Sequence, residues 1–189
     1  ILAENALFQM FLKNADKQGN GYEEVCRTAS KWASVTGIQY WLIDKPAESG
    51  NTLKDEIDKE LYPYIIRLSP RSVLDWGLDH YGNPLWIKVK EDAEDRETFT
   101  EKAKKVERYR IWYRDHWELY EVELSSGGGS RAIKADEGEH PVGEVPIVPV
   151  VHVSEQPMSG LSLIEDIAYV NRAIYNWCSL LDEILYRQT

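Results

Sequence analysis

The sequence has few cysteines and no long apolar run, and each absence excludes a class of protein. Its two cysteines, Cys26 and Cys178, lie far apart and lack the CxxC or Cys/His spacing of a zinc site. We expect both to be reduced, mostly buried, small apolar side chains. Because no stretch of about 18 uninterrupted apolar residues occurs, we expect no membrane-spanning helix.

The local motifs of the common enzyme classes are also missing. A nucleophile elbow, a P-loop, a dinucleotide-binding glycine set and a zincin helix are all absent. The histidines share no i, i+2 or i, i+4 spacing, which favours exposed loop residues over a metal site. We therefore expect no enzymatic activity and no catalytic, cofactor-binding or metal-binding residues. The four histidines are His80, His116, His140 and His152.

Positive charge is scarce, since the 189 residues carry a formal net charge of -10. Proteins that grip nucleic acid neutralise its phosphates with clustered Lys and Arg, so this balance argues against tight binding of that kind. An acidic wall past which DNA slides remains compatible with it. The 43% hydrophobic content, with seven Trp and eleven Tyr, is typical of a globular protein of one domain or two small ones.

The first part of the sequence predicts two helices and a strand. Apolar residues fall at helical spacing over Glu4–Lys13 and again over Tyr22–Ala33, with Gly37 as a stop. The β-branched and aromatic run Ile38–Ile43 then predicts a strand. We treat residues 1–52 as a helical lead-in plus strand.

The middle of the sequence predicts an antiparallel β region over residues 53–158, opened by a short amphipathic segment. Polar turns at Asp79–Asn83 and Arg114–His116 favour hairpins. The Gly/Ser composition around Ser125–Ser130, natural or engineered, predicts a flexible loop over residues 125–139. Three prolines in His140–Val150 predict an extended segment along a sheet edge. The strands of the expected meander are Tyr64–Leu68, Ser72–Leu78, Leu85–Lys90, Tyr109–Arg114 and Trp117–Leu124.

The last part, residues 159–189, predicts a long amphipathic helix, so the fold class expected is α+β. Ser162–Glu165 has the form of a capping box. Apolar residues then alternate three and four apart, opposite a charged side that we expect to be solvated. The candidate subunit-interface residues on this stripe belong to the core or to a contact between subunits, and the core is favoured. They are Ile167, Ile174, Trp177 and Leu181.

Two alternative functions use the β region. Asp75 and Asp79 flank Trp76 and invite comparison with the paired carboxylates of a glycosidase, but four residues of extended strand separate them by roughly 13 Å. We expect Asp75 to accept backbone hydrogen bonds instead. The Trp-rich strands, with Trp41, Trp86, Trp112 and Trp117, could also serve a ligand-binding virion or adaptor module, although packing is the simpler interpretation.

Several stretches together resemble the portal proteins of tailed bacteriophages, the subunits of the head–tail connector. They are Ser69–Trp76, Tyr109–Tyr120, His140–Val150 and the final helix from Ile164 to Asn176, in the order found in that family. The resemblance covers most of Tyr62–Thr189. It rests on diffuse patterns, and the first 51 residues match only as a generic helical lead-in.

The resemblance implies a structural subunit of the portal ring, with a wing region leading toward the stem. It implies about a dozen copies around a channel at the capsid vertex, through which viral DNA is packaged and ejected. Terminase, capsid and head–tail adaptor proteins would be partners, and double-stranded DNA would pass without sequence-specific binding. The location would be the virion, and the host cytoplasm during assembly. Because the sequence begins at Ile1 and stops within a helical pattern, we expect a fragment of a longer chain.

Overall fold

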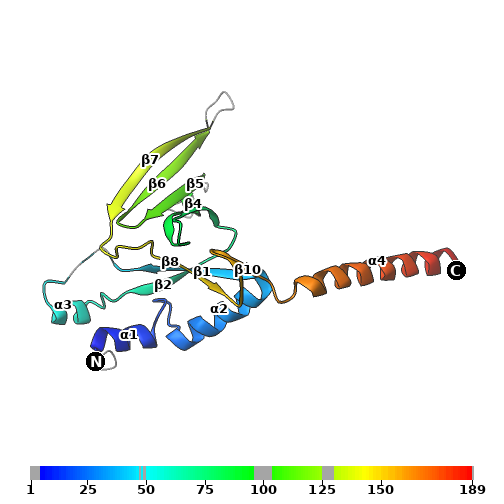
Figure 1. Cartoon of the computed structure of the whole chain (residues 1–189), viewed down its shortest axis with the longest axis horizontal. Helices are drawn as coiled ribbons and strands as arrows, with labels where there is room; N and C mark the ends of the chain where they lie inside the picture. The colour runs from blue at the N-terminus through cyan, green and yellow to red at the C-terminus, as the bar shows by residue number, and fades with distance from the viewer. Residues whose placement is uncertain (1–4, 47, 49, 96–103, 125–129, 189) are drawn as a thin grey trace.

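A body of helices and sheets carries one long helix that projects away from it (Figure 1). This computed structural model describes residues 5–46, 48, 50–95, 104–124 and 130–188. It confirms the α+β class. The helices are α1 (Ala6–Lys13), α2 (Tyr22–Thr36), α3 (Leu53–Asp58) and α4 (Glu165–Gln188). The strands are β1 (Ile38–Asp44), β2 (Tyr64–Leu68), β3 (Val73–Leu78), β4 (Pro84–Asp95), β5 (Lys104–Tyr113), β6 (His116–Leu124), β7 (Ser130–Glu139), β8 (Ile147–Val151), β9 (Val153–Gln156) and β10 (Ser159–Leu161).

The two N-terminal helices begin and end where local chemistry favours it. The side chain of Asn5 accepts hydrogen bonds from the backbone N–H groups of Leu7 and Phe8, which caps the start of α1. Helix α2 ends at Gly37, whose φ of 86° lies in a region that other residues rarely adopt. The helix therefore continues to Thr36, beyond the predicted end at Ala33.

Strand β1 lies at the centre of a three-stranded antiparallel sheet in the order β2-β1-β8. The prediction that Tyr64–Leu68 joins the meander is wrong, because β2 pairs with β1, with Leu42 opposite Ile66. The apolar pattern identifies a strand but not its partner. Since β1 lies before residue 52 and both of its partner strands, β2 and β8, lie after it, the boundary drawn there falls inside one sheet.

Strand β8 confirms the edge position expected for the proline-rich segment. It forms one edge of the three-stranded sheet, and Pro149 lies opposite Tyr40 of β1. Proline lacks the N–H that an inner strand must donate, so an edge is where it can be accommodated.

The larger sheet is a five-stranded antiparallel meander in the order β3-β4-β5-β6-β7. Its first turn is the predicted one, because Asp79 N–H donates to the carbonyl of Asn83 at 2.9 Å. Tryptophan rings cover glycines on adjacent strands: Trp117 lies opposite Gly138, where a Cβ would approach the indole within 2.8 Å. The ring thus fills the space that the missing side chain leaves.

The predicted flexible loop over residues 125–139 is wrong for its second part. Residues 130–139 form β7, which pairs with β6, while residues 125–129 lie outside the described part of the chain. Strand β7 is polar because it is an exposed sheet edge, where charged side chains prevent unwanted pairing. Lys134 also forms an ion pair with Glu118 on β6, with Nζ and Oε1 2.7 Å apart.

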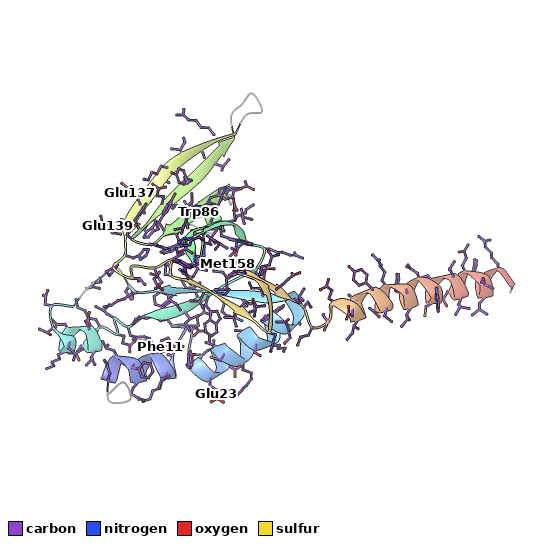
Figure 2. The ribbon with its side chains drawn as sticks, in the orientation of Figure 1. Phe11, Glu23, Trp86, Glu137, Glu139 and Met158 are labelled. Carbon is purple, nitrogen blue, oxygen red and sulfur yellow. The ribbon has the colours of Figure 1, made fainter. Side chains whose placement is uncertain are left out.

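The core has two parts, one on each face of β1. Ile38, Tyr40 and Leu42 point toward the meander, whereas Trp41 and Ile43 point toward the N-terminal helices, as the period of a strand requires. The body is therefore a layer of helices, a small sheet and a larger sheet. The buried residues between the two sheets are Ile38, Tyr40, Leu42, Val73, Ile87, Val89, Trp112, Val145, Ile147 and Met158, the last of which is labelled in Figure 2.

Candidate assembly surface

Helix α4 has the apolar periodicity of a helix that packs against another surface, yet no described residue of the body covers it. Every residue from Leu163 to Arg187 is exposed, and Figure 2 shows side chains standing free along the whole helix. Ile167, Ile174, Trp177 and Leu181 are between 52% and 70% exposed, so the expectation that they belong to the core is wrong. The helical periodicity is confirmed, but no element in the described part of the chain packs against this stripe.

The exposed apolar residues of α4 follow the spacing of a coiled coil. Ile167, Ile174 and Leu181 occupy one heptad position, and Val170, Trp177 and Ile184 occupy the other. Spacings that alternate between three and four residues keep such side chains in line when helices supercoil around one another. We call these six residues the α4 seam.

The seam becomes a wider apolar face in the second half of the helix. Leu180 flanks it on one side, and Cys178 and Leu185 flank it on the other. Cys178 is exposed, which corrects the expectation of burial, whereas Cys26 is half-buried; both are free thiols. An apolar stripe wider than two heptad positions is typical of a helix that contacts more than one neighbour. The remaining face is polar, with Arg172 over the ring of Tyr169 at 5.6 Å and Arg187 paired with Glu183.

Hydrogen bonds attach the start of α4 to the end of α2. Ser162 Oγ donates to the carbonyl of Val35 at 2.7 Å, and Leu163 N–H donates to the carbonyl of Ser34 at 3.0 Å. Ser162 Oγ also accepts from Ile164 N–H, one residue before the Glu165 N–H that a capping box requires. The predicted capping box is therefore replaced by a bridge between two helices.

Two glycines bring the backbone of α2 directly against β10 just before α4. A Cβ on Gly37 would collide with the carbonyl of Gly160, and a Cβ on Gly160 would lie 2.8 Å from Cγ1 of Val151. Only glycine at both positions allows this approach. The sequence gives no local signal for this contact, because the two residues are far apart in the chain.

The side chains considered for chemistry or ligand binding in the sheets serve packing and turns. Trp112 is buried, Trp117 packs against the same core, and Trp41 packs toward the N-terminal helices. Asp75 accepts a hydrogen bond from the Trp76 N–H, as expected. His140 lies against the Trp112 ring, with Nε2 3.0 Å from the Tyr113 carbonyl.

Asp79 organises the first turn of the meander. Its carboxylate accepts hydrogen bonds from the N–H groups of Tyr81 and Asn83 and pairs with Arg114 at 3.2 Å. The Asn83 N–H, followed by the other donors, lowers the pKa of Asp79 to about 2. The same carboxylate lines a cavity of about 430 Å³ with Arg114 and Glu144. A carboxylate held ionised in this way stabilises a turn and is a poor proton donor at neutral pH.

The described residues bring together no group of three or more His, Cys, Asp or Glu side chains that could hold a metal ion. Among the helices within the described ranges, none is both long enough and apolar enough to cross a membrane. No protein-family model matches this chain, and no curated protein matches it. The α4 seam is thus the feature of the molecule whose exposure most needs a functional explanation.

Proposed function

We propose that this chain is a structural subunit of a symmetric ring, the portal or head–tail connector of a tailed bacteriophage, and that α4 is its main contact with neighbouring copies. The observation that carries the proposal is the α4 seam, an exposed coiled-coil pattern on a helix that projects from its own body. The resemblance of the β region and the final helix to portal proteins supports the same assignment. In this role the chain is mechanical and holds no active site.

Energetics favour covering the seam. Fully burying an Ile, Leu or Val side chain stabilises a protein by about 1.5–3 kcal/mol relative to leaving it in water. The six seam residues are each more than half exposed. Covering them would contribute on the order of 5–10 kcal/mol for each chain before the entropic cost of association, which is in the range that stable assemblies need.

Copies of the same chain are the best-fitting occupant of this surface. The seam lacks charges at its centre, so a neighbour must present an apolar stripe of the same width, and α4 of another copy does so. The apolar flanks at Leu180 and Leu185 allow each helix to contact a neighbour on both sides. Contacts of that kind close into a ring when the rotation between copies divides a full turn and involves no shift along the axis.

The test is the size and symmetry of the assembly. We expect mass photometry and sedimentation velocity to show a large oligomer, and negative-stain electron microscopy to show rings of about a dozen copies with a central hole. Ile174→Asp places a charge in the seam and should yield monomers. Tyr175→Asp, on the adjacent exposed side of the helix, is the matched control and should still assemble. Monomeric wild-type protein at all concentrations, or equal effects of the two variants, would overturn the proposal.

A further inference from the structure

A basic groove lies between the end of α2 and strand β2. It has a volume of about 720 Å³, and its walls include Trp32 of α2 and the arginines Arg67 and Arg71. The floor is fixed, because buried Gln39 donates from Nε2 to the carbonyl of Leu68 at 2.6 Å. Trp32 is about half exposed and forms an apolar wall beside the charged groups.

The two groove arginines differ from most others in the chain because they have no acidic partner within the described residues. Arg27, Arg108, Arg110, Arg114 and Arg187 each pair with a carboxylate. Arg131 and Arg172 also lack an ion pair among the described residues, but Arg67 and Arg71 differ from them in lining the same groove. Guanidinium groups bind carboxylates and phosphates through paired hydrogen bonds, so an anion is the ligand that this groove fits.

Two exposed carboxylates lie at the start of α4, close in the chain to residues that bond to the end of α2. Glu165 and Asp166 form the first turn of α4, and neither has an ion pair among the described side chains. That turn follows directly on Ser162 and Leu163, which bond to the carbonyls of Val35 and Ser34 near the end of α2. The groove is lined by Trp32 and Thr36 of the same last turns of α2.

We propose that Arg67 and Arg71 bind the Glu165 and Asp166 carboxylates of the neighbouring copy. This inference rests on the proposed ring. Rotation about a ring axis keeps every feature at its own height. The groove and the acidic turn both lie near the end of α2, so the turn of one copy would come to about the height of its neighbour's groove. Each contact would join the groove of one copy to the acidic turn of the next, and the contact would repeat around the ring.

An acidic protein surface fits this groove better than nucleic acid does. Phosphate backbones are bound by clusters of Lys and Arg, whereas here two arginines stand on a chain with ten excess negative charges. Those charges would repel an approaching nucleic acid at low salt. Two carboxylates on one helical turn equal the two guanidinium groups in number and are opposite to them in charge.

The experiment reverses the charges on each side of the contact. Arg67→Glu with Arg71→Glu, and separately Glu165→Lys with Asp166→Lys, should each raise the concentration needed for assembly by about ten-fold or more. The chain that carries all four changes restores opposite charges and should assemble within about three-fold of wild type. Arg131→Glu, which reverses an exposed arginine on β7 that also lacks an ion pair in the described structure, is the control and should have no effect.

The outcomes separate this inference from the ring proposal. Assembly of the arginine variant at wild-type concentrations, or a four-change chain that is not restored, would overturn the ion-pair contact while Ile174→Asp still tests the ring. A monomeric wild-type protein would overturn both. A labelled single-stranded oligonucleotide offers a further test. If it binds in a way that requires Arg67 and Arg71 and does not interfere with assembly, the contact would be overturned and the groove assigned to nucleic acid.

Discussion

The body and helix α4 contain the same kinds of apolar residues and use them in opposite ways. Ile87 of the meander is fully buried between the two sheets, whereas Ile174 of α4 is 52% exposed. Both belong to periodic apolar patterns, one of a strand and one of a helix. The difference shows that a periodic pattern identifies the apolar face of an element. It does not identify the surface that packs against that face.

The comparison also separates two kinds of stability. The body has its own core on both faces of β1, so its free energy of unfolding should not depend on protein concentration. In the proposed assembly the stability of α4 should depend on concentration, because its seam would be covered by another copy. Variants can be chosen that act on one region and leave the other intact.

The largest effect should come from truncating a buried residue of the body. Ile87→Ala removes a fully buried side chain and should lower the free energy of unfolding by about 3–4 kcal/mol, since the cavity is enclosed. Ile174→Ala in α4 is the matched change and should cost less than about 1 kcal/mol under conditions in which the protein is monomeric. Urea unfolding at low protein concentration measures both. Equal losses would show that α4 is packed in solution.

The next effect concerns the join between the two regions. Gly160→Ala forces a Cβ against the carbonyl of Gly37 and the side chain of Val151, and should cost about 2 kcal/mol through displaced backbone. Gly143→Ala is the comparison, because its φ of 75° is strained for alanine but nothing lies within 4 Å. It should cost about 1 kcal/mol. A milder effect at Gly160 than at Gly143 would mean that the close approach is loose.

A smaller effect should follow from one buried hydroxyl. Tyr40→Phe removes the 2.7 Å hydrogen bond to the carbonyl of Met158 and should cost about 1–2 kcal/mol. Burial raises the pKa of Tyr40, so the unfolded chain loses this proton at lower pH than the folded chain. Stability from this group is therefore present below about pH 10 and falls as pH rises beyond it. The variant should show a shallower alkaline loss, and Tyr175→Phe on exposed α4 should show no change.

The smallest effect should appear in acid. The pKa of Asp79 is about 2 in the folded body, below its ordinary value of 3.8. A depressed pKa of this kind adds stability above the ordinary value, and that stability is lost as pH falls from about 4 toward 2. Asp79→Ala should flatten this part of the stability profile measured by circular dichroism. An unchanged acid profile would show that the turn does not depend on the carboxylate.

The sequence predicted the elements whose signals are local. Helix α2, strand β1, the hairpin turn at Asp79 and helix α4 follow from spacing and turn chemistry within a few residues of themselves. The α4 seam also follows, because its six residues repeat in the sequence. Four of the six, Ile167, Ile174, Trp177 and Leu181, are the candidate interface residues that the sequence predicts.

The sequence did not predict features that depend on distant partners. Strand β7 is polar because it is a sheet edge, so its composition resembles that of a loop. It becomes a strand by pairing with β6. The burial of α4 was predicted wrongly because the pattern alone does not reveal that the body stops short of it. The groove at Arg67 and Arg71 is invisible for the same reason, because Trp32 and the two arginines are brought together only by folding.

The close contact between Gly37 and Gly160 lies at the base of α4, so a small rotation there would be amplified along the helix. A helix of 24 residues is about 36 Å long, so a rotation of roughly 5° at its base moves its far end by about 3 Å. Side chains in a supercoil interlock only when they meet within a fraction of that distance. In the proposed ring, Gly37 and Gly160 would then influence the angle at which neighbouring α4 helices cross, and through that angle the number of copies.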